Sequence, residues 1–148
     1  MNKEYLNVIL TDSDEGIHIL FKNVFQDLKI NIKVRSFYDG KNLMNYLNDK
    51  ESSVPEILFV NYDIPEKSSL ECLSEIKSNF KFDNMVTAIY SSRLSADEEE
   101  DVFLKGANVF MQQPDNYKDL KKSLTEIVII NWQYHTSGLN KNNFIMKA

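Results

Sequence analysis

The chain has 148 residues, 43% of them hydrophobic and 26% charged, which suits one globular domain with a sizeable core. The formal net charge of −5, with no lysine or arginine cluster, argues against nucleic-acid binding. The single cysteine, Cys72, excludes an internal disulfide. The polar N-terminus and the lack of a long apolar run predict a cytoplasmic protein with no signal peptide and no membrane span.

The first half of the chain alternates between strands and helices. Short apolar runs predict strands at residues 6–11, 32–37 and 57–60. Ser13 and Asp14 can cap a first helix, and helical spacing predicts a buried face made of Ile17, Leu20, Phe21, Val24 and Leu28. A second helix is predicted to begin at Asp39-Gly40 and to bury Leu43, Met44 and Leu47.

The second half continues the same alternation. A third helix is predicted to bury Leu70, Leu73, Ile76 and Phe80, with Cys72 packed among them and without a redox role. A fourth strand follows at residues 85–90. Ser95 and Glu98 match a capping box, and the acidic run 98–101 fits a solvated first helical turn. Gly106 is predicted to end that helix, before a fifth strand at Val109–Gln112 and a fifth helix that buries Leu120, Leu124, Ile127 and Val128.

Five strand–helix units with short connections predict an α/β fold, a doubly wound (βα)5 domain with a five-stranded parallel sheet and helices on both faces. We place this domain at residues 1–131. Residues 132–148 form a polar C-terminal tail, predicted either to be disordered or to dock as a strip on the surface.

Two segments that follow predicted strands carry motifs. Asn61-Tyr62-Asp63-Ile64-Pro65 resembles an Asp-x-x-x-Pro motif with asparagine in place of the aspartate, and residues 106–114 resemble Gly-Ala-x-x-aromatic-x-x-Lys-Pro. At these places in a five-unit pattern, the motifs resemble the receiver domain of bacterial two-component response regulators. The resemblance covers roughly residues 5 to 130. It implies the flavodoxin-like fold of the chemotaxis regulators, with strand order 2-1-3-4-5.

In that family, an aspartate after the third strand takes a phosphoryl group from a kinase phosphohistidine, beside a magnesium ion held by an acidic pair after the first strand. Cations and hydrogen-bond donors must surround such a highly charged transition state. The resemblance implies the following pocket positions here: the acidic pair at Asp12 and Ser13, the phosphoacceptor at Asn61, a metal-binding carbonyl at Asp63, the switch hydroxyl at Ser91, the lysine position at Gln113, and the switch aromatic at Phe110.

Three of these positions have lost their charge. Asn61 and Ser13 remove two negative charges, and Gln113 removes a positive one. Magnesium favours carboxylate ligands, so the remnant at Asp12 and Asp63 would hold it poorly. We therefore expect a degenerate, pseudo-receiver site with no catalytic residue, no cofactor and no enzymatic activity.

The resemblance then implies a stand-alone domain of two-component phosphorelay signalling that acts by protein–protein contact. The expected partner is a histidine kinase, another response regulator or a second copy in a homodimer, with no role for nucleic acid or membrane. The expected contact surface is the fourth helix, fifth strand and fifth helix, around Phe103, Met111, Tyr117 and Lys121.

Other interpretations stay open beside this one. The domain could accept a phosphoryl group on a substitute residue, Asp12 or Asp63, or it could be a structural dimerisation module. Reading Asp63 as the true acceptor would break the spacing to Pro65. A flavodoxin is disfavoured because the carboxylates in residues 11–15 would repel a phosphate. His18 and His135 are predicted to be surface or packing residues and not catalysts.

Overall fold

The computed structural model describes residues 5–137 and 146–148. Its centre is a parallel sheet of six strands in the order β2-β1-β3-β4-β5-β6. The strands are β1 (Leu6–Thr11), β2 (Ile32–Phe37), β3 (Ile57–Asn61), β4 (Val86–Ser91), β5 (Val109–Gln112) and β6 (Met146–Lys147). The predicted fold class and the order of the first five strands are confirmed, and β6 is an addition to the prediction.

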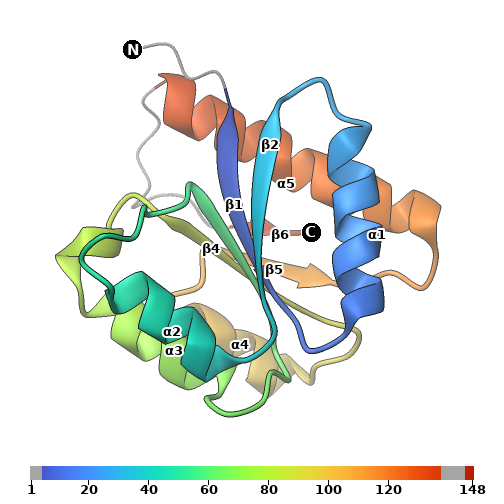
Figure 1. Cartoon of the computed structure of the whole chain (residues 1–148). Coiled ribbons are helices and arrows are strands. Elements are labelled where there is room, and N and C mark those ends of the chain that lie inside the picture. Colours follow the sequence, from blue (N-terminus) through green and yellow to red (C-terminus); the bar gives the residue numbers. More distant parts are fainter. Residues whose placement is uncertain (1–4, 138–145) are drawn as a thin grey trace.

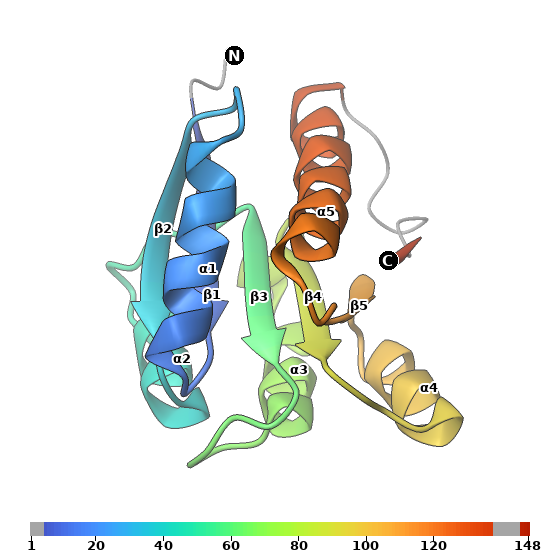
Figure 2. The ribbon, with the colours of Figure 1, turned by 90° about the vertical axis from the view of Figure 1, so that its right-hand side faces the viewer.

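In the described residues, five α-helices cover the two faces of the sheet: α1 (Glu15–Gln26), α2 (Gly40–Asn48), α3 (Ser69–Lys77), α4 (Ala96–Leu104) and α5 (Tyr117–Ser137), with a short 3-10 turn η1 (Phe80–Phe82) after α3. Helices α1 and α5 lie on one face, and α2, α3 and α4 lie on the other (Figures 1 and 2). No helix among the described residues is both long and apolar enough to cross a membrane.

The sheet separates two hydrophobic clusters, which explains why the central strands are apolar at nearly every position. Successive side chains of a strand point to opposite faces. Val8 and Leu10 of β1 therefore pack toward α1 and α5, whereas Ile9 packs toward α2 and α3. The predicted buried faces of α2 and α5 are confirmed, because all their predicted members are buried: Leu43, Met44 and Leu47 of α2, and Leu120, Leu124, Ile127 and Val128 of α5.

The predicted helix ends are largely confirmed. Asp14 and not Ser13 caps α1, and Asp39 caps α2. Ser95 and Glu98 form the predicted capping box of α4, which has three acidic residues in its first turn. Gly106 follows α4 with a φ of 116°, a left-handed conformation that glycine adopts without a steric penalty.

Two predicted core positions are wrong. Leu20 is 37% exposed, because the buried stripe of α1 runs through His18, Phe21, Val24 and Phe25. Phe80 is 89% exposed, because α3 ends at Lys77 and its helical spacing does not extend to residue 80.

Helix α5 continues without a break past the predicted boundary at residue 131, to Ser137. At the C-terminus, residues 146–148 lie along β5 and pair with it. The Met146 amide donates to the Asn108 carbonyl at 2.8 Å, the Ala148 amide donates to the Phe110 carbonyl at 2.9 Å, and the Gln112 amide donates to the Ala148 carbonyl at 3.2 Å. Residues 138–145 and the side chain of His135 lie outside the described residues.

Candidate functional site

The predicted pocket positions gather at the carboxyl end of the sheet. In a parallel sheet the strand ends meet at one edge, where ligands of open α/β folds bind. Thr11 pairs with Val60, and Asn61 pairs with Tyr90. The residues that follow β1, end β3 and end β4 are therefore neighbours.

Asp12, at the predicted position of the acidic pair, is buried and hydrogen-bonded within the protein. The Tyr90 hydroxyl donates to Asp12 Oδ2 at 2.6 Å, and the Asp14 amide donates to Asp12 Oδ1 at 2.8 Å. Burial, and then the nearby Asp12 charge, raise the pKa of Tyr90 far above its ordinary value, so its hydroxyl stays protonated and remains a donor. Each oxygen of the Asp12 carboxylate thus has a donor from the chain itself.

Asn61 shapes the loop after β3. Its Oδ1 accepts a hydrogen bond from the Asp63 amide at 3.0 Å, while its Nδ2 reaches the Tyr90 carbonyl only at 3.5 Å. The Tyr62 amide donates to the same Tyr90 carbonyl at 2.9 Å. The Asp63 side chain is exposed and has no partner among the described residues. Asn61 therefore acts here as a turn-forming acceptor, a common use of asparagine.

The switch positions are packed into the structure. The buried Ser91 hydroxyl accepts from the Arg93 amide at 3.3 Å, and the Gln113 amide donates to the Ser91 carbonyl at 2.8 Å. Phe110 is buried in the cluster on the α2–α4 side of the sheet. Ser13 is exposed in the turn before α1, and its side chain has no hydrogen bond to these residues within the described chain.

Two residues near Asp12 were not identified from the sequence as part of the site. His18 is fully buried, as a packing residue would be, but it also holds the Asp12 backbone: its Nε2–H donates to the Asp12 carbonyl at 2.9 Å, and Nδ1 lies 3.1 Å from the Ser36 hydroxyl. Tyr90 is the other. Its only signal in the sequence is one tyrosine at the end of an otherwise non-aromatic strand.

The side-chain oxygens at the strand ends do not fit the ligand set of a magnesium ion. Magnesium needs a near-octahedral set of oxygens, usually with one or two carboxylates. The oxygens of Asp12 and the side-chain oxygen of Asn61 already accept hydrogen bonds. Among residues 5–137 and 146–148, no group of three or more histidine, cysteine, aspartate or glutamate residues is placed to hold a metal.

Cys72 lies outside the site, buried in α3 with its Sγ 3.9 Å from the Gly40 carbonyl. Burial raises the pKa of the Cys72 thiol to about 11. The thiol is therefore protonated at neutral pH, which disfavours redox or nucleophilic chemistry.

The predicted partner surface is only partly exposed. Met111 is fully buried, because its side chain points into the cluster beneath α5. Tyr117 and Lys121 reach back toward α1, where both approach Asp27 Oδ2, at 3.5 Å and 3.3 Å. Phe103 is half-buried, and its neighbour Leu104 is 74% exposed.

We compared the sequence with protein families and with curated proteins. No family model matches the chain. One curated relative, the probable methanogenesis regulatory protein FilR2 of Methanothrix harundinacea, is 24% identical over 124 residues, which cover 81% of this chain and 80% of the relative.

Solved structures align over most of the chain. They include the Mn(2+)-bound response regulator Rcp1 (TM-score 0.76, 21% identity, 82% of this chain and 91% of that one) and the phosphorylated cyanobacterial phytochrome response regulator RcpA (TM-score 0.78, 18% identity, 92% and 97%). A receiver domain from Rhodospirillum rubrum aligns with a TM-score of 0.73 at 17% identity, over 84% and 92% of the two chains. The chain therefore has the flavodoxin-like fold of a response regulator receiver domain.

Proposed function

We propose that this chain is a receiver-type signalling domain that acts through protein–protein contact and performs no phosphoryl chemistry of its own. The observation that carries the proposal is the state of Asp12. Tyr90 and Asp14 donate to its two oxygens, so the carboxylate is stabilised without a metal.

The chemistry of the neighbouring positions supports the same conclusion. A phosphoacceptor needs a carboxylate oxygen to attack phosphorus, and the Asn61 amide has none. A phosphoryl group also needs cations around it. Gln113 is neutral, and the described part of the chain has no group of three or more histidine, cysteine, aspartate or glutamate residues placed to hold a metal ion.

The second candidate function is phosphorylation on a substitute acceptor, and the geometry favours Asp63 over Asp12 for that role. Asp63 is exposed and its carboxylate has no partner among the described residues, whereas Asp12 is buried and doubly hydrogen-bonded. The two functions can therefore be separated at one residue.

The test is incubation with phosphoramidate and magnesium, followed by intact mass spectrometry. We expect no phosphoryl adduct on the wild-type chain. An adduct that disappears in Asp63→Asn but persists in Asp83→Asn, an exposed aspartate after η1, would establish the substitute acceptor and overturn the proposal.

The proposed partner surface is α4 together with β6. Leu104 of α4 is largely exposed, and the exposed Glu100 and Asp101 precede it on the same helix. An exposed apolar residue with an acidic rim suits a partner that presents an apolar pocket with basic residues around it. A histidine kinase, another response regulator and a second copy are the candidate partners.

Affinity capture from native cell extract tests this surface. We expect Leu104→Asp to lose the proteins that the wild-type chain retains, while Ile19→Asp on α1, also exposed, keeps them. Analytical ultracentrifugation of the pure protein tests whether the partner is a second copy of the chain. A dimer that both variants leave intact would instead favour a structural dimerisation module that uses another surface.

A further inference from the structure

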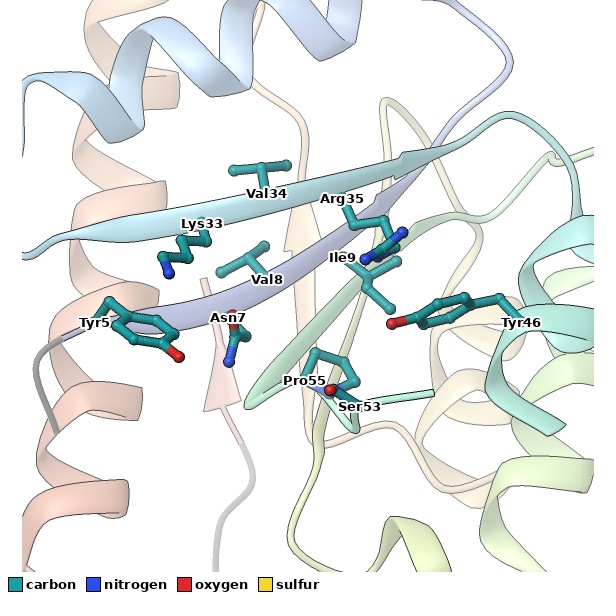
Figure 3. A pocket seen from close by; sticks show the side chains of 10 residues that line it. All are labelled: Tyr5, Asn7, Val8, Ile9, Lys33, Val34, Arg35, Tyr46, Ser53 and Pro55. Carbon is teal, nitrogen blue, oxygen red and sulfur yellow. The ribbon is translucent and has the colours of Figure 1, made fainter. Parts of the chain in front are cut away.

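A groove separate from the strand-end site lies on the α2 side of β1 and β2. Its volume is about 450 Å³, and it is walled by Tyr46 of α2 and by Ser53 and Pro55 of the segment that leads to β3 (Figure 3). Asn7 pairs with Lys33, and Ile9 pairs with Arg35, so these four residues lie side by side on one face of the two strands.

Two positively charged side chains, Lys33 and Arg35, line the groove, although the net charge of the chain is −5. Lys33 Nζ lies 3.8 Å from the centre of the Tyr5 ring, and Arg35 Cζ lies 4.6 Å from the centre of the Tyr46 ring. These cation–π contacts position both side chains without neutralising them. Among the described residues, neither cation has a carboxylate partner.

The remaining polar groups of the groove are also without partners in the described chain. They are the side-chain amide of Asn7 and the hydroxyls of Tyr5, Tyr46 and Ser53. Asparagine is disfavoured inside a strand, and the next β1 residue on the same face is the apolar Ile9. Glu56 is not among the lining residues, and its carboxylate accepts a hydrogen bond from the Asn7 backbone amide at 2.8 Å. The groove therefore offers donors and positive charge.

We propose that this groove binds a small organic dianion, with one acidic group beside Lys33 and the other beside Arg35. The two side chains point toward opposite ends of the groove (Figure 3), and their Cα atoms stand about 6.6 Å apart along an extended strand. Arg35 can bind a carboxylate or phosphate in a bidentate manner, and Lys33 supplies a compact charge. The volume falls in the range of small-molecule sites.

An acidic peptide offers the same charges, but its usual attachment to a sheet is through main-chain bonds along an edge strand. The donors described above are side chains on the face of the sheet, which favours a small molecule. The site lies away from Asp12 and Asn61, so it does not depend on the proposed signalling function.

Isothermal titration of the full chain tests the proposal with two dianions (adipate and terephthalate) and with hexanoate as the matched monoanion. We expect at least one dianion to bind about tenfold or more tightly than hexanoate. Lys33→Ala and Arg35→Ala should each weaken that dianion about tenfold, with unchanged circular dichroism. Lys118→Ala, which removes an exposed lysine of α5, should bind as the wild type does.

Three outcomes would overturn the proposal. They are no heat with any dianion at millimolar concentration, equal affinity of the wild type and both groove variants, and tighter binding of a short polyglutamate peptide than of every dianion. The last result would assign the groove to an acidic protein partner.

Discussion

At the scale of single residues, the main feature of the site is the hydrogen bond from the Tyr90 hydroxyl to the Asp12 carboxylate. The hydroxyl is fully buried, and the Asp12 carboxylate is its acceptor. A buried carboxylate is costly unless it is hydrogen-bonded or paired. Here the compensation comes from hydrogen bonds donated by a phenol and a backbone amide of the protein itself.

Tyr90→Phe should therefore destabilise the protein. The ring still packs against Phe21, 5.1 Å away between centroids, so the change removes mainly the hydrogen bond to a buried carboxylate. We expect a loss of about 1–3 kcal/mol in the free energy of unfolding by urea. Tyr117→Phe, whose exposed hydroxyl contacts Asp27 only at 3.5 Å, should change it by less than about 0.5 kcal/mol. Equal effects in both variants would argue against the role of Tyr90.

We also expect the difference in stability between the wild type and Tyr90→Phe to depend on pH. The folded pKa of Tyr90 is raised, so the protonated phenol stabilises the native state fully below the unfolded pKa of about 10. Above that pH the unfolded tyrosine ionises and the native one does not, so the wild type loses up to about 1.4 kcal/mol per pH unit. The difference between the wild type and Tyr90→Phe should therefore shrink between about pH 9 and pH 11. A constant difference would contradict this expectation.

At the scale of elements, β6 completes the sheet where β5 would otherwise be an open edge. Open edges invite pairing with other chains. Residues 146–148 cover this edge, Met146 and Ala148 pack against the cluster beneath α5, and Lys147 Nζ lies 2.7 Å from Glu99 Oε1 of α4. The C-terminus is thus part of the α4–β5–α5 surface, and a partner that binds there must contact β6 or displace it.

Deletion of residues 146–148 should expose one particular amide. The Gln112 amide donates to the Ala148 carbonyl, so we expect its hydrogen exchange to become markedly faster in the shortened chain. Lys147→Ala removes only an exposed ion pair and should leave the protection of Gln112 intact, with a change in stability of at most about 1 kcal/mol. Unchanged exchange after the deletion would show that β6 does not hold this edge in solution.

At the scale of the whole molecule, the sequence was sufficient where structure follows from local pattern. The first five strands, the caps at Asp39 and Ser95 and the left-handed Gly106 are such cases. Local pattern fails where a contact joins distant segments. Tyr90 and Asp12 are 78 residues apart, and nothing in either segment specifies that they meet.

In the candidate site, too, the positions of the residues could be predicted from the sequence, whereas their hydrogen bonds could not. Asp12, Asn61, Ser91 and Gln113 gather at the strand ends as the predicted parallel topology requires. Which groups bond to which depends on side-chain packing that periodicity does not encode. The two-residue strand β6 is too short to carry a pattern, and residues 132–137 of α5 lie in polar sequence that resembles a tail.

The extent of α5 leads to the last prediction, which compares chains that end at Ser137 and at Asn131. Asn131 is fully buried, and its Nδ2 donates to the Ile127 carbonyl at 2.8 Å. Ending the chain there places a terminal carboxylate in the core and removes Trp132, which packs against the same cluster. We expect the 1–131 chain to be about 3 kcal/mol or more less stable than the 1–137 chain, measured by urea unfolding with circular dichroism. Because both chains lack β6, the difference isolates the last turns of α5, and equal stabilities would support residue 131 as the domain boundary.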